Sequence, residues 1–143
     1  MCGHLRLCPL LLLLLLPLGC GKHYQLAPVS GRVTMDNRPL AHAEVRFYPI
    51  GGLDFPYSVG VTDDQGNYTL HLGIDNNTEG AVVGEHRVTI SIDQQKAKTA
   101  STPGTRMSAW RGELVPGRYN RDSKLTCIVP PEGTQDARFD LKR

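Results

Sequence analysis

Apolar and polar residues alternate at every second position in several short segments of this chain. Residues 29–34 read VSGRVT, residues 43–48 read AEVRFY and residues 85–92 read EHRVTISI. A period of two is typical of half-buried β-strands, because successive side chains of a strand point to opposite faces of the sheet. We therefore expect three strands here, each with one face toward a core. The residues expected on the inward faces are Val29, Gly31, Val33, Ala43, Val45, Phe47, His86, Val88, Ile90 and Ile92.

The sequence DDQGN at residues 63–67 separates two further short segments, 57–62 and 67–72. Aspartate side chains accept hydrogen bonds from nearby backbone N–H groups, and glycine adopts a positive φ without strain, so this pentapeptide is typical of a tight turn. Tyr68 and Leu70 then resume the alternation. The combination predicts a β-hairpin.

The C-terminal part repeats the pattern, with alternating residues at 123–129 and 136–141 and the turn sequence PPEG between them. The residues expected to face inward are Leu125, Cys127, Val129, Ala137, Phe139 and Leu141. Residues 73–84 and 93–112 are expected to be connections. About seven short strands and no helix of standard length predict an all-β fold, an antiparallel β-sandwich.

The N-terminus predicts a targeting segment. Leucines fill residues 10–16, a run too short for a bilayer, which needs about 20 apolar residues. The run ends at Gly19 and Cys20 and resembles a bacterial lipoprotein signal, in which the cysteine is lipidated after cleavage. The chain departs from that pattern at Pro17, where the family usually has leucine. An ordinary cleaved secretory signal is the alternative.

The expected organisation follows from this signal. Residues 1–19 are the signal peptide, residues 20–28 the lipidated cysteine and a tether, and residues 29–143 the sandwich domain. A lipid on Cys20 would hold the protein at a membrane of the cell envelope, on the periplasmic or outer-membrane face. Without the lipid, the protein would be secreted.

Charge and cysteine content narrow the possible functions. The chain has 16 Lys and Arg against 14 Asp and Glu, scattered along its length, which gives no electrostatic reason to expect a nucleic-acid partner. Cys2 and Cys8 would leave with the signal and Cys20 would carry lipid, so Cys127 would remain without a disulfide partner. We expect Cys127 to be a small buried residue, since the sequence places no activating base beside it.

The sequence predicts no catalytic residue, no metal site and no cofactor. Its five histidines include no H-E-x-x-H pair, and its Asp-rich turns do not match a calcium-binding loop. Nor does it contain a nucleophile elbow, a phosphate-binding loop or a dinucleotide fingerprint. An enzyme or ligand-binding site using His71, His86 or Arg87 across a dimer groove remains the rival interpretation.

Three motifs resemble one known family. They are VSGRVTMDNRPLAHAEVRFYP, GVTDDQGNYTL and LVPGRYNRDSKLTCIVPPEG. Together they are similar to the carboxypeptidase regulatory-like, or transthyretin-like, β-sandwich domain, in the form found in small bacterial lipoproteins. The matching positions are Val29, Gly31, Val33, Pro39, Leu40, Val45, Phe47, Thr62, Asp63, Gly66, Tyr68, Pro116, Tyr119, Ser123 and Leu125.

The resemblance implies a seven-stranded Greek-key sandwich with no chemistry of its own. A related transthyretin-like hydrolase branch ends in a Tyr-Arg-Gly-Ser-type tail, whereas this chain ends in FDLKR. The expected function is therefore that of a non-catalytic envelope lipoprotein that contacts a protein or a cell-surface polymer. We expect the contact surface in the loop at 93–112, with Arg106, Trp110 and Arg111. A carbohydrate-binding module is a further alternative, which Tyr48, Tyr57 and Trp110 on one flat face would favour.

Overall fold

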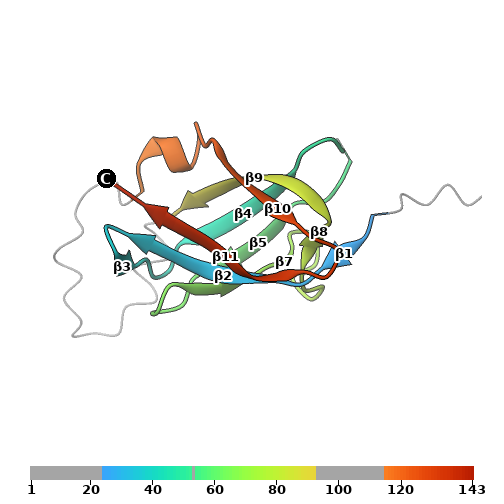
Figure 1. The fold of residues 1–143 in the computed structure, drawn as a ribbon, viewed down its shortest axis with the longest axis horizontal. Helices are drawn as coiled ribbons and strands as arrows, with labels where there is room; N and C mark the ends of the chain where they lie inside the picture. Colours follow the sequence, from blue (N-terminus) through green and yellow to red (C-terminus); the bar gives the residue numbers. More distant parts are fainter. Residues whose placement is uncertain (1–23, 53, 93–114) are drawn as a thin grey trace, which may run out of the picture.

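The computed structural model describes residues 24–52, 54–92 and 115–143, and this part of the chain is all-β, as predicted (Figure 1). It contains eleven strands and one 3-10 helical turn, η1 (Gly117–Tyr119). The strands are β1 (Leu26–Ala27), β2 (Val29–Met35), β3 (Arg38–Pro39), β4 (Glu44–Pro49), β5 (Ser58–Val61), β6 (Asn67–Thr69), β7 (His71–Leu72), β8 (Ala81–Val82), β9 (Gly84–Ser91), β10 (Leu125–Val129) and β11 (Thr134–Leu141).

Two main sheets face each other. The five-stranded sheet has the order β10-β9-β4-β5-β7, and the four-stranded sheet has the order β11-β2-β3, with β6 also paired to β2. In Figure 1, β2 and β11 lie in front of β4 and β5. The rings of Phe47 and Phe139, one from each sheet, meet between them with centroids 6.1 Å apart. A small third sheet pairs β1 with β8.

The predicted inward residues form the core. Val33, Val45, Phe47, Val88 and Ile90 have no exposed surface. Val29, His86, Val129, Ala137, Phe139 and Leu141 are also buried, while Ile92, Leu125 and Cys127 are partly buried against them. The period of two thus identified the buried face of each long strand, because burial of one face requires that register.

Strand direction differs from the prediction at one place. All the other pairings are antiparallel, but β11 runs parallel to β2, with Phe139 beside Val33 and Leu141 beside Met35. The expectation of a wholly antiparallel sandwich is therefore wrong at this pair. Alternation of side chains is the same in parallel and antiparallel strands, so the pattern specifies the faces and not the direction.

The predicted turn at residues 63–67 is present, but its two arms divide between the sheets. The Asp63 carboxylate accepts hydrogen bonds from the backbone N–H groups of Gln65 and Asn67 at 2.8 and 2.9 Å, and Gly66 has a φ of 78°. After the turn, β6 pairs with β2, and only β7 returns to β5. The prediction of a simple hairpin is therefore wrong, because the segment after the turn passes from the four-stranded to the five-stranded sheet at Leu70.

Two short segments predicted to be irregular contribute to the fold. β1 lies in the expected tether and β8 in the expected connection at 73–84, and their residues Ala27 and Ala81 are buried. A two-residue strand is too short to show a period, so neither strand could be recognised from alternation. The packed domain therefore begins before residue 29.

One side-chain hydrogen bond links β6 to β11 across β2 in the four-stranded sheet. The Tyr68 hydroxyl of β6 donates to the Ala137 carbonyl of β11 at 2.7 Å, and β2 lies between these strands. A β-bulge between Thr134 and Ala137 brings this carbonyl so close that a Cβ at Gly31 would lie 1.9 Å from its oxygen. Burial raises the pKa of the Tyr68 hydroxyl, so it remains a donor at physiological pH.

The substitution Tyr68→Phe tests this bond. It keeps the ring but leaves the Ala137 carbonyl without its donor, so we expect the free energy of unfolding to fall by about 1–3 kcal/mol. Urea denaturation measures the change, with Tyr57→Phe as the control, since Tyr57 is a half-buried tyrosine that precedes β5. Equal effects of the two substitutions would contradict the role given to Tyr68.

Candidate functional site

Four of the predicted site residues lie outside the described part of the chain. They are Cys20, the expected lipid attachment point, and Arg106, Trp110 and Arg111, the expected contact residues in the loop at 93–112. The lipid anchor and this contact surface stay predictions.

The structure does not bring His71 and His86 together. His71 belongs to β7 and His86 to β9, and β4 and β5 lie between those strands. Three strand spacings correspond to roughly 14 Å. His86 points into the core, whereas Arg87, its neighbour in β9, faces outward with its guanidinium over the Tyr48 ring. A shared site built from these three residues within one chain has no geometric support.

His86 instead lies beside Cys127, a neighbour that sequence reasoning missed. The two residues are directly opposite in the pairing of β9 with β10, and both are on the inward face. Cross-strand partners of this kind have Cβ atoms about 4.5–5.5 Å apart. The inward sets of both strands were predicted, but only knowledge of which strands pair, and in which register, would have placed the histidine at the thiol.

This pair is not an activated nucleophile. Burial raises the pKa of the Cys127 thiol, and burial lowers the pKa of His86, so both groups are held in their neutral forms. His86 Nδ1 lies 3.1 Å from the Gly84 carbonyl, which can only accept, so this nitrogen carries the proton. The ring packs at 5.6 Å from the Phe47 ring. These contacts are those of a core residue.

The acidic turns use their carboxylates to hold the backbone. Asp63 accepts from two backbone N–H groups, and Asp75 accepts from those of Asn77 and Thr78 at 3.1 and 3.0 Å. These hydrogen bonds lower the pKa of both carboxyls. Within residues 24–52, 54–92 and 115–143, no three His, Cys, Asp or Glu side chains are grouped as metal ligands would be.

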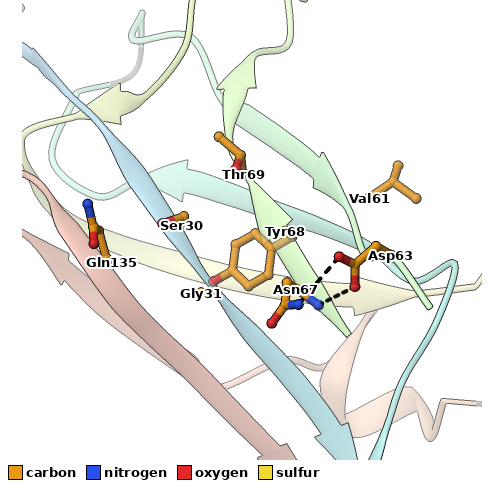
Figure 2. A pocket seen from close by; sticks show the side chains of 8 residues that line it. All are labelled: Ser30, Gly31, Val61, Asp63, Asn67, Tyr68, Thr69 and Gln135. Atoms are coloured by element: carbon orange, nitrogen blue, oxygen red, sulfur yellow. Dashed lines mark hydrogen bonds between the residues drawn. The ribbon is translucent and has the colours of Figure 1, made fainter. Parts of the chain in front are cut away.

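A groove of about 380 Å³ crosses the outer face of the four-stranded sheet where β2, β6 and β11 meet (Figure 2). We call it the polar groove. Figure 2 shows the Tyr68 ring near the centre of the lining residues, with its hydroxyl at Gly31, and the Asp63 carboxylate bonded to Asn67 at one side. The lining residues are Ser30, Gly31, Val61, Asp63, Asn67, Tyr68, Thr69 and Gln135.

Two further hollows continue the polar groove. One of about 220 Å³ shares Gly31, Asn67 and Gln135 with it and adds two guanidinium groups, Arg32 and Arg138. Another of about 440 Å³ shares Val61 and Thr69 with it and is bordered by Val59, Gly60, His71 and Asn76. The three hollows therefore form one elongated depression that runs from β11 across β2 and β6 to β7.

The chemistry of this depression is that of recognition. Its hydroxyl, amide and guanidinium groups can exchange hydrogen bonds with a polar ligand, and Val61, 59% exposed, offers an apolar contact. Arg32 and Arg138 are direct neighbours in the register of β2 and β11. Two like charges side by side destabilise a sheet slightly, so a carboxylate or another hydrogen-bond acceptor bound to these arginines would stabilise it. Arg138 has one in Asp136, while Arg32 forms no ion pair within the described part of the chain.

Aromatic residues gather at the end of the domain where β4 leads into β5. A second groove, of about 380 Å³, is lined there by Tyr48, Pro49, Gly51, Gly52, Phe55 and Tyr57. The Tyr48 and Tyr57 rings are 5.7 Å apart, as centroids, and Phe55 meets the ring of Tyr24 edge to face at 5.9 Å. We call this second hollow the aromatic groove.

Two arginines lie over the rings of tyrosines that line the aromatic groove. The guanidinium carbon of Arg87 is 5.4 Å from the Tyr48 ring centroid, and that of Arg46 is 5.9 Å from the Tyr57 ring centroid. Arg46 also pairs with Glu44 at 2.6 Å, and its hydrogen bond with Tyr48 is the largest of the causes that raise its pKa. These cation–π contacts leave one charged guanidinium, that of Arg87, beside the aromatic rings without a carboxylate partner among the described residues.

Comparisons with known proteins identify no relative. No family model matches the chain, and neither a curated protein nor a solved structure is similar to it. The resemblance to the carboxypeptidase regulatory-like domain therefore stays a prediction. Among the residues that the structure describes, no helix has the length and apolar character needed to cross a membrane.

His86 predicts a dependence of stability on pH. Its pKa in the folded protein is lowered from the ordinary value of 6.5, so the unfolded chain binds more protons below about pH 6.5. The contribution of His86 to the free energy of unfolding should therefore be constant above pH 7. Below pH 6.5 the free energy of unfolding should fall, by at most about 1.4 kcal/mol per pH unit from this residue.

Chemical denaturation between pH 7.5 and 5.5 measures this slope, since the carboxyl groups titrate lower. His86→Leu should flatten it. An unchanged slope in His86→Leu would contradict the assignment.

Proposed function

We propose that this protein is a non-catalytic envelope lipoprotein, anchored through Cys20, whose β-sandwich is a binding module. The observation that carries the proposal is the elongated depression formed by the polar groove and its two neighbouring hollows. Such a shape fits an extended polymer better than a compact substrate. The groups that line it are suited to binding: none is a nucleophile paired with a base.

A cell-surface carbohydrate is the ligand class best supported by the lining. Ser30 and Thr69 supply hydroxyls, Asn67 and Gln135 supply amides, and Arg32 and Arg138 supply guanidiniums. Amides and guanidiniums bond sugar hydroxyl and carboxylate groups through fixed pairs of donors and acceptors. The aromatic face expected of a carbohydrate-binding module includes Trp110, which lies outside the described residues, and arginines lie over the rings of Tyr48 and Tyr57. The polar groove is therefore the better candidate.

The transthyretin-like hydrolase or ligand-binding interpretation has weaker support. Its proposed residues, His71 and His86, lie on strands separated by two others, and His86 is enclosed in the core. Only His71 borders the depression. A single imidazole at the end of a groove supports binding more readily than catalysis.

Removing hydrogen-bonding side chains from the polar groove tests the proposal. In Arg32→Ala combined with Gln135→Ala, we expect at least about tenfold weaker binding to polysaccharide isolated from the host envelope, since a bond to a charged group contributes about 1.5–3 kcal/mol. Affinity electrophoresis of the folded variants measures the change.

Lys124→Ala is the matched control, because it removes an exposed cation near the five-stranded sheet. Binding that is lost equally in Lys124→Ala would show a general charge effect and contradict the site. So would wild-type binding that the double substitution leaves intact.

A further inference from the structure

Exposed apolar side chains concentrate at one end of the sandwich. The described part of the chain has four large hydrophobic residues that are mostly exposed: Ile50 at 51%, Val61 at 59%, Ile74 at 69% and Ile128 at 72%. Three of the four, all except Val61, belong to the same end. Isolated exposed apolar residues need no explanation, but a shared position does.

Pairing of the strands establishes this shared position. Ile128 is opposite Glu85 in the pairing of β10 with β9, and the Glu85 carbonyl accepts from the Ile50 N–H at 2.8 Å. Ile74 follows Gly73, whose N–H donates to the Tyr57 carbonyl at 2.9 Å. The aromatic groove, with Phe55 and Tyr57, lies between these isoleucines. We call Ile50, Phe55, Tyr57, Ile74 and Ile128 the apolar end.

The N-terminal strand is at this same end. Tyr24 contacts the Phe55 ring, and β1 pairs with β8 there. In Figure 1, β1, β8 and the connection from β4 to β5 all lie toward the right of the view. Leu26 is six residues after Cys20 in the sequence, so even a fully extended chain spans at most about 20 Å between them.

We propose that the apolar end is a membrane-docking surface that rests on the lipid headgroups. The inference depends on the proposed lipid anchor at Cys20, which would hold this end within about 20 Å of the bilayer. Isoleucine and phenylalanine side chains would enter the interface, tyrosines would keep their hydroxyls at headgroup level, and Arg87 would bind a lipid phosphate.

Several acids share this end and limit the electrostatic contribution. Glu85 lies between Ile50 and Ile128, and Asp75 follows Ile74. The attraction is therefore mainly hydrophobic, so docking should occur on zwitterionic lipid as well as anionic lipid. With the apolar end on the membrane, the polar groove on the four-stranded sheet remains open to a ligand in the envelope.

Photo-crosslinking of the full-length lipidated protein tests the orientation. A benzoylphenylalanine replaces Ile50 or Ile128 in one set of variants and Val61 in the matched control, which is equally exposed but lies at the far end of β5. The proteins are reconstituted in phosphatidylcholine vesicles and irradiated, and lipid adducts are counted by mass spectrometry. We expect adducts at positions 50 and 128 and few at position 61.

A further substitution measures the energetics. Ile74→Ser should reduce the adducts formed at position 50 by about tenfold, since it removes an apolar side chain from the interface. Protein that stays with the vesicles but gives equal adducts at 50 and 61 would overturn the docking surface and leave the anchor intact. Protein that does not stay with the vesicles would overturn the anchor, and the docking surface with it.

Discussion

The hydrogen bond from Tyr68 to the Ala137 carbonyl is the contact on which the four-stranded sheet depends. It spans β2 and links β6 to β11, the last strand of the chain, at the point where a β-bulge interrupts the pairing. Ala137 is the residue at which β11 resumes its pairing with β2 after the bulge, opposite Gly31, and the buried phenol satisfies its carbonyl. Gly31 makes the contact possible, since any side chain at that position would meet the same carbonyl.

The same contact lies at the candidate binding site. Gly31 and Tyr68, the two residues that make room for the bond and donate it, also line the polar groove, and Figure 2 shows the Tyr68 ring among the other lining residues. Because the Tyr68 ring is part of the core, the polar side chains around it stand on rigid strands. A structural contact of the sandwich and the binding surface proposed for it thus share residues.

The polar and the apolar exposed surfaces of the domain lie in different places. Hydroxyl, amide and guanidinium groups line the outer face of the four-stranded sheet, and exposed isoleucines and aromatic rings gather at the end that carries the N-terminal strand. A protein held by a lipid benefits from such a division, because a defined contact with the membrane fixes which surface points away from it. One covalent anchor alone would let the domain rotate.

The sequence predicted the buried faces of the strands but not their partners. Burial of Val33, Phe47 and Phe139 follows from alternation along each strand, a local property. Three features depend instead on contacts between distant segments, which alternation along one strand does not reveal. They are the parallel direction of β11, the change of sheets at Leu70 and the pairing of His86 with Cys127.

The same limit applies to the candidate site. The isoleucines of the apolar end lie in separate segments, and nothing in those segments predicts that they share one end of the domain. They are Ile50, Ile74 and Ile128. Gly31 and Tyr68 were recognised as motif positions, yet only the fold shows that one makes room for the carbonyl that the other binds. The residues predicted from sequence to form the contact surface belong to the segment 93–112, outside the described residues.

The most direct test of the account is the mass of the N-terminal peptide of the protein isolated from its own host. If the protein is anchored as proposed, this peptide begins at Cys20 and carries a diacylglyceryl group on the thiol. An N-terminal peptide with an unmodified Cys20 would contradict it, since the sandwich would then have no anchor to hold its apolar end at a membrane.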